Sequence, residues 1–156
     1  MNNPLPLDPN GHPILTTDWA AQVEKLVEFS DDANENGDYD GTGNPQTLFT
    51  ITGTVLLRIL AVCEEDLTSS GGTIEVGTAL SAAGMIAQTT ASAVDVNEIW
   101  HDNSPDSSIE ATTVLTQKIV NQDIIQTIGT ADVSAGKIRY IALWYPLSAG
   151  ASVEAA

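Results

Sequence analysis

The chain is poor in the side chains that most often perform chemistry. It contains one cysteine and two histidines among 156 residues. A single cysteine cannot form an intrachain disulfide bond, so the fold cannot depend on one. Cys63 ends an apolar run that begins at Leu60, and this setting predicts a small buried side chain instead of a reactive thiol.

Basic residues are also scarce. Only 5 Lys and Arg stand against 21 Asp and Glu, which gives a formal net charge of -16 at pH 7. Affinity for nucleic acid rests on Lys and Arg that displace counterions from phosphates, and an anionic surface repels phosphate backbones and acidic lipids alike. The composition therefore predicts no nucleic-acid or membrane partner and favours basic proteins or cations.

Long hydrophobic runs are missing as well. The most apolar stretch, residues 55–63, is interrupted by Arg58 and is far too short to cross a bilayer. Residues 4–9 contain three prolines, and this end lacks the basic-then-apolar order of a signal peptide. These features predict a soluble protein made in a cytoplasm.

No group of residues has the pattern of a catalytic centre. His101 beside Asp102 is the better candidate for acid–base chemistry, but neighbours on a strand point to opposite faces. No serine sits in a sharp Gly-flanked elbow, and the lone cysteine lies in an apolar run. We therefore expect His101 to bond a loop backbone, and we expect that the protein is not an enzyme.

Apolar and β-branched runs separated by turn residues fill most of the chain, whose length fits one domain with a sizeable core. The alternation at residues 19–29 favours a strand over a short helix. Further strands are predicted at residues 47–52, 55–64, 73–77, 85–89, 99–101, 112–120, 124–129 and 138–145. Turn residues at 66–72 and 132–136 predict hairpins. This pattern predicts an all-β fold, a two-sheet antiparallel β-sandwich of the jelly-roll or Ig-like kind.

Two segments of the chain lack core-forming patterns. Residues 1–18 are rich in Pro, Asn and Gly without periodicity, which predicts an extended N-terminal arm that gains order by lying against a partner. Residues 19–156 are then the single sandwich domain. Within it, residues 30–45 are the most polar stretch and predict a long acidic loop between strands.

The strand predicted at residues 138–145 is apolar on both faces. Tyr140 and Trp144 fall on one face, and Leu143 and Tyr145 fall on the other. Such a strand is either central in its sheet or has an outer face that meets another subunit. With the apolar residues of the arm and Trp19 directly after it, this predicts an interface set: Leu5, Leu7, Ile14, Leu15, Trp19, Leu143 and Tyr145.

Oxygen-bearing side chains stand at alternate positions of the acidic loop: Asp32, Asn34, Asn36, Asp38 and Asp40. Alternate residues of a curled loop point inward, where several oxygens can surround a calcium ion, and Gly37 stands where such a loop turns sharply. However, Gly43 replaces the bidentate glutamate of an EF-hand loop, and no flanking helices are predicted. Two hypotheses remain, a loose calcium site and a solvated acidic loop.

Four segments of the chain resemble small proteins encoded by tailed bacteriophages and prophages. They are TLFTITG at residues 47–53, IEVG at 74–77, NEIWHD at 97–102 followed by Pro105 and Asp106, and LWYPLS at 143–148. The resemblance covers most of residues 12–156. It implies a virion structural component, although the acidic loop is less typical of such proteins.

The charge narrows this implied role. An acidic protein is a poor lining for a DNA-filled shell, whereas an acidic outer coat stays soluble and does not adhere to the genome. We therefore predict a decoration, or cement, protein on the outer capsid surface, made in the bacterial host cytoplasm and bound to the major capsid protein. A homo-oligomer is expected, and the resemblance favours a trimer. No cofactor is expected apart from the calcium of the acidic-loop hypothesis.

The alternative to a decoration protein is a tail or fibre β-sandwich that binds a receptor or carbohydrate, with calcium in the loop.

Overall fold

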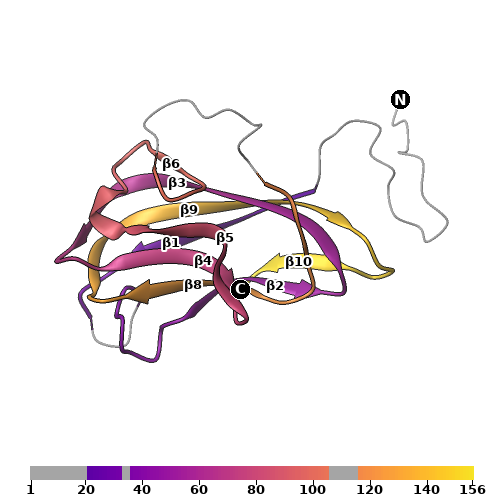
Figure 1. The fold of residues 1–156 in the computed structure, drawn as a ribbon, viewed down its shortest axis with the longest axis horizontal. Coiled ribbons are helices and arrows are strands. Elements are labelled where there is room, and N and C mark those ends of the chain that lie inside the picture. The colour runs from indigo at the N-terminus through magenta and orange to yellow at the C-terminus, as the bar shows by residue number, and fades with distance from the viewer. Residues whose placement is uncertain (1–20, 33–35, 106–115) are drawn as a thin grey trace.

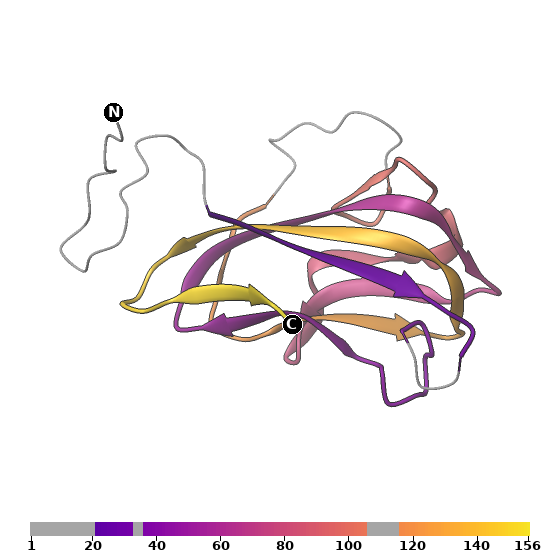
Figure 2. The same ribbon diagram turned by 180° about the vertical axis from the view of Figure 1, so that it is seen from behind.

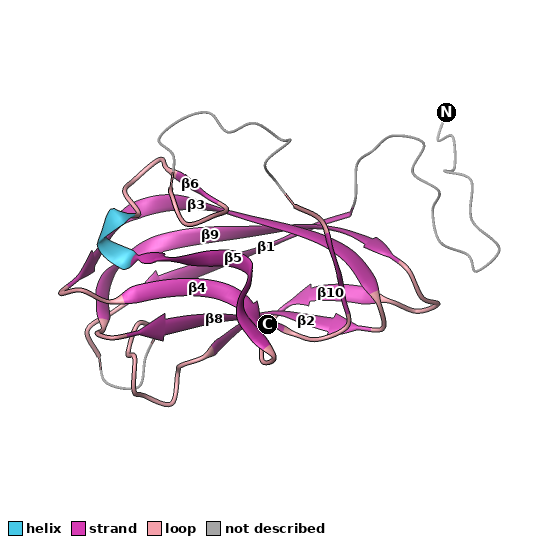
Figure 3. Cartoon of the chain, viewed as in Figure 1, coloured by secondary structure: helices cyan, strands magenta, loops and turns pink. Residues whose placement is uncertain are grey.

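The computed structural model describes residues 21–32, 36–105 and 116–156, and most of these residues lie in β-strands (Figures 1 and 3). A single 3-10 turn, η1 (Ala91–Ala93), is the one helical element in these three ranges. The strands are β1 (Ala21–Phe29), β2 (Gln46–Thr52), β3 (Val55–Ser69), β4 (Thr73–Thr78), β5 (Ser81–Thr90), β6 (Ile99–Trp100), β7 (Lys118–Val120), β8 (Ile124–Gly129), β9 (Val133–Pro146) and β10 (Ser152–Ala155).

Two antiparallel sheets face each other, as both views of the ribbon show (Figures 1 and 2). The first sheet has the order β1-β9-β3, with β6 and β7 one after the other along the free edge of β3; the second has the order β10-β2-β8-β4-β5. The pairing is nested, because β1 pairs with β9, β2 with β8, β3 with β6 and β7, and β4 with β5. This is the arrangement of a jelly roll, and the predicted two-sheet antiparallel β-sandwich is confirmed.

Both predicted hairpins are wrong. β3 continues to Ser69 while β4 lies in the opposite sheet, so residues 70–72 cross between the sheets. β8 and β9 also lie in different sheets, and residues 133–136 belong to β9 itself. Within the described residues the tight hairpin joins β4 to β5, where Thr78 pairs with Ser81. Turn residues mark where the chain reverses, but they do not say which sheet receives the next strand.

The predicted strand positions are otherwise close to those observed. β1 confirms the strand favoured at residues 19–29, and residues 30–45 connect β1 to β2 as expected. The strand predicted at 112–120 is wrong in extent, since β7 begins only at Lys118 and residues 112–115 lie outside the described residues. β10 was not predicted, because its short sequence Ser-Val-Glu-Ala carries little strand signal. The predicted arm, residues 1–18, lies outside the described residues.

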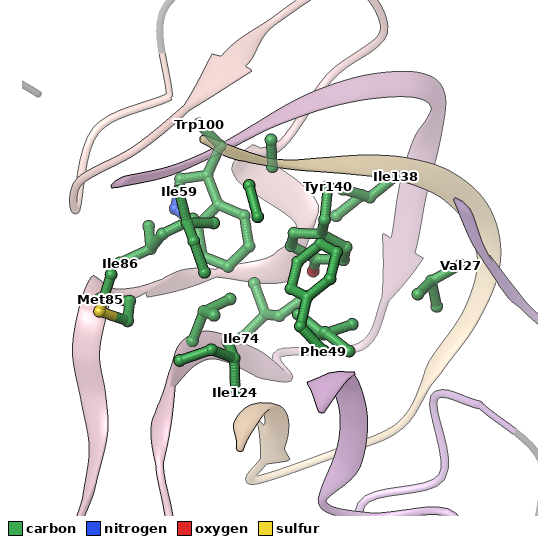
Figure 4. Packing of buried hydrophobic residues seen from close by; sticks show 14 of the residues in the cluster. Val27, Phe49, Ile59, Ile74, Met85, Ile86, Trp100, Ile124, Ile138 and Tyr140 are labelled. Atoms are coloured by element: carbon green, nitrogen blue, oxygen red, sulfur yellow. The ribbon is translucent and has the colours of Figure 1, made fainter. Parts of the chain in front are cut away.

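The core fills the space between the two sheets (Figure 4). Phe49, Ile74 and Ile124 point inward from one sheet toward Ile138 and Tyr140 of the other, and all five are fully buried. Alternation along the strands produces this arrangement, because every second side chain of a strand points to the same face.

A polar pair lies within this apolar core. The Tyr140 hydroxyl donates a hydrogen bond of 2.5 Å to the Oε1 atom of Gln126, and both side chains are almost completely buried. Tyr140 belongs to β9 and Gln126 to β8, so the bond joins the two sheets. Burial raises the pKa of Tyr140 well above its ordinary value, which keeps the hydroxyl protonated and able to donate.

Candidate functional site

The acidic loop is fastened to the starts and ends of strands in both sheets. The Val133 backbone N–H of β9 donates to the Gly37 carbonyl at 2.8 Å. The Asn44 side chain both donates to the Ile128 carbonyl at 2.7 Å and accepts from the Ile128 N–H at 2.9 Å, as a neighbouring strand would. These bonds hold the end of the loop against β8 and the beginning of β9.

Gly37 is required where the loop meets β9. Its φ of 108° is a conformation that side chains with a Cβ rarely adopt, and an added Cβ would overlap the carbonyl oxygen of Val133. The glycine was predicted to permit a sharp turn. Its larger role is to let the loop backbone approach β9.

This approach assembles three carboxylates, from Asp38, Asp40 and Asp132, whose nearest oxygens all lie within 4.8 Å of one another. We call these three residues the carboxylate cluster. Asp132 also accepts a hydrogen bond of 2.9 Å from the Tyr39 backbone N–H, which ties the tip of the loop to the β8–β9 connection. Asp38 is partly buried, and the other two carboxylates are exposed.

The cluster overlaps the predicted calcium ligands only in part. Asp38 and Asp40 belong to it, but the structure does not bring Asp32 to it. The Asn36 side-chain amide instead donates to the Glu28 carbonyl at 3.2 Å, and Asn34 lies outside the described residues. Sequence reasoning missed Asp132, which follows another strand far along the chain. The calcium site therefore stays a prediction.

The carboxylate cluster has an electrostatic cost. A hydrogen bond with Asp38, helped by the negative charges of Asp38 and Asp132, raises the pKa of the Asp40 carboxyl. Because the folded state holds the Asp40 proton more tightly than the unfolded chain does, this effect favours the folded state at acid pH. The advantage is lost as the pH rises from the unfolded pKa through the folded one.

Replacing Asp40 with asparagine should therefore raise the melting temperature at pH 7 and have little effect near pH 3, where the carboxyl is already protonated. Melting curves in a chelating buffer at both pH values measure this. Asp32→Asn is the matched control, because it removes one exposed charge outside the cluster. An equal gain from both variants would show that only the net charge of the chain matters.

A second candidate site is the outer face of the β1-β9-β3 sheet, which contains two of the predicted interface residues, Leu143 and Tyr145. Cross-strand rows build this face: Leu56 pairs with Ile119 and with Tyr145, and Leu60 pairs with Ile141. All are at least partly exposed, and Ile119 is 70% exposed. We call the following set the apolar half-face: Leu56, Leu60, Ile119, Ile141, Leu143 and Tyr145. The remaining predicted interface residues, Leu5, Leu7, Ile14, Leu15 and Trp19, lie outside the described residues.

The other half of the same face is charged and paired within the chain. Lys137 contacts Glu65 at 2.8 Å and Glu28 at 3.5 Å. Arg139 contacts Glu64 at 2.6 Å and Glu24 at 3.1 Å. The hydrogen bond with Glu64 is the main cause of the raised pKa of Arg139. Exposed pairs of this kind stabilise a fold only slightly, but they leave this half of the face with few unmet charges.

The remaining candidates from the sequence are His101 and the tryptophans, and those that the structure describes are buried or partly buried. His101 is buried, and its Nδ1 atom lies 4.0 Å from Asp102, too far for a hydrogen bond. Trp100 is fully buried and packs edge-on against Tyr140 at 6.3 Å between ring centroids. Trp144 is partly buried against the core, and Trp19 lies outside the described residues. Among the described tryptophans, none forms an exposed platform for a sugar ring.

The order and pairing of the strands place this protein in the class of jelly-roll β-sandwiches. Comparison of the chain with protein-family models, with curated proteins and with solved structures finds no match. The described segments contain no helix with the length and hydrophobicity that a membrane crossing requires.

Proposed function

We propose that this protein is a non-enzymatic structural component of a tailed-phage virion that decorates and stabilises the outer surface of the capsid. The observation that carries the proposal is an anionic jelly-roll body, in a chain that has 21 acidic and 5 basic residues. Repulsion from DNA keeps such a body out of the genome-filled interior. Its high net charge keeps it soluble before assembly. Jelly rolls also recur among viral capsid proteins.

The four segments that resemble phage proteins lie in the sandwich itself, at β2, β4, β6 and the end of β9. Because one fold serves many functions, the proposal relies on these segments and on the surface more than on the fold class. The apolar half-face adds support, since it offers a place for contact with a neighbouring molecule of an assembly.

In this proposal the arm, residues 1–18, binds the major capsid protein, and the sandwich stands on the shell as a homo-oligomer, for which a trimer is expected. Repeated copies on a lattice turn weak individual contacts into firm attachment. The protein is made in the host cytoplasm, joins the virion from outside, and binds neither nucleic acid nor membrane.

Removal of residues 1–17 should abolish binding to purified shells that lack this protein and leave the sandwich folded. Cosedimentation with shells measures binding, and a thermal melt of the free protein checks the fold. The intact chain serves as the control in both measurements. Unchanged occupancy of the truncated chain on the shells would contradict the proposed role of the arm.

A tail or fibre module that binds a receptor or carbohydrate is the alternative function. The carboxylate cluster is the observation that favours it, and calcium bound there would link the acidic loop to Asp132. Copy number separates the two functions. A decoration protein is present in hundreds of copies per particle, whereas a tail module is present in a handful, and quantitative mass spectrometry of purified particles counts them.

A further inference from the structure

Arg58 lies among the residues of the apolar half-face and differs from the other basic residues of the chain. All five Lys and Arg lie within the described residues. Lys137 and Arg139 pair with glutamates, and Lys25 and Lys118 donate to the backbone oxygens of Ala156 and Gly84. Arg58 makes no such contact with any described residue, and its Nε atom is buried without a hydrogen-bond partner.

The surroundings of Arg58 are apolar. It lies on β3 directly opposite Leu143 of β9, in the row between the pair Leu56–Tyr145 and the pair Leu60–Ile141. The guanidinium group thus sits within the apolar half-face, while the carboxylates of the face gather at its other end around Lys137 and Arg139. The buried Nε atom shows that the inner part of this side chain is packed into the face, but Arg58 as a whole is partly exposed, so a carboxylate brought by another molecule can pair with the exposed part of the guanidinium group.

The opposite sheet shows that this surface is unusual for the molecule. The outward positions of β2, β4, β8 and β10 are mostly polar, and include Thr50 paired with Glu154 and Glu75 paired with Thr127. An antiparallel sheet with one face in water normally has this polar outer side. The apolar half-face departs from the rule, which is expected of a surface that is covered in an assembly.

We propose that the apolar half-face binds a second copy of this chain, with a carboxylate of that copy accepting hydrogen bonds from Arg58. The occupant must bring apolar side chains together with an acidic group. A basic protein would set its charge against Arg58, whereas this chain carries four times as many acidic residues as basic ones, 21 against 5. Arginine and tyrosine are enriched among the residues that dominate binding energy at interfaces, and this surface contains Arg58 and Tyr145.

The charge of the chain gives the contact a characteristic salt dependence. Two copies, each with a net charge of -16, repel each other across the solvent. Screening shortens the reach of this repulsion from about 10 Å in 0.1 M salt to about 3 Å in 1 M salt, but it acts much less on a buried ion pair. Self-association through the apolar half-face therefore becomes stronger as salt is added.

Sedimentation equilibrium of the full-length chain in 0.1 M and 1 M salt tests the inference. The expected result is association that strengthens in 1 M salt and weakens at least about tenfold in both Arg58→Glu and Leu143→Ser. Val96→Ser is the matched control, because Val96 is 44% exposed and lies outside the apolar half-face. It should associate like the unaltered chain, and melting curves confirm that each variant is folded.

Three results would overturn the inference. The first is a chain that stays monomeric at every salt and protein concentration at which it is soluble. The second is association that both half-face variants leave unchanged, and the third is association that weakens with salt, which would indicate contact between oppositely charged surfaces. The experiment contains no shells, so its outcome is separate from that of the proposed capsid binding.

Discussion

Replacing Gly37 with alanine is expected to lower the free energy of unfolding by about 2–4 kcal/mol. Two costs combine. Alanine is strained at a φ of 108°, and its Cβ would overlap the carbonyl oxygen of Val133. Relief of the overlap requires the loop to move away from β9, which breaks the 2.8 Å bond from the Val133 N–H to the Gly37 carbonyl.

Gly71→Ala is the control that separates these two costs. Gly71 has a similar φ of 117°, but an added Cβ there would meet no atom within 4 Å. Urea unfolding of both variants should show a clearly larger loss for Gly37→Ala, and amide exchange at Val133 should accelerate in that variant alone. Equal losses would mean that strain explains the whole effect and that the loop does not depend on close approach to β9.

The second large effect is expected at the polar pair between the sheets. Tyr140→Phe leaves the Oε1 atom of Gln126 buried with no donor, at a cost of about 1–3 kcal/mol. Gln126→Met should cost a similar amount, because it leaves the Tyr140 hydroxyl buried with no acceptor. The double variant Tyr140→Phe with Gln126→Met removes both polar groups at nearly constant volume and should recover most of the loss.

A double-mutant cycle measured by urea unfolding gives the coupling energy of the pair. Strong coupling is expected, because the two residues contact only across the interior, where water does not replace a lost partner. Additive losses in the double variant would contradict this account and would indicate that packing, and not the hydrogen bond, dominates at these positions.

The sequence predicts the strands well, because alternation along a strand is a local property. In β3, Leu57, Ile59 and Ala61 are buried while the residues between them face outward, as the pattern indicates. The sheet that each strand joins is not a local property. The turns at 66–72 and 132–136 have hairpin-forming residues, yet in a jelly roll consecutive strands mostly alternate between sheets, so these turns cross the sandwich.

Local sequence patterns also predict only part of each candidate site. Asp38 and Asp40 lie two positions apart in the sequence and are predicted together, but Asp132 joins them only because β8 and β9 return the chain to the same end of the sandwich. Leu143 and Tyr145 were predicted as an apolar face from one strand alone. Their neighbours Leu56 and Ile119, and the position of Arg58 among them, depend on the register of three strands.

The single cysteine gives the sandwich an internal probe of its own opening. The thiol of Cys63 is 2% exposed, and burial raises its pKa to about 11, so at neutral pH it is protonated and shielded from reagents. An alkylating compound can reach it only after the structure around it opens, including the segment at Val94 that lies 3.5 Å from the sulfur. Because the sequence contains no other cysteine, a single mass increment identifies each molecule that has opened, without any engineered label.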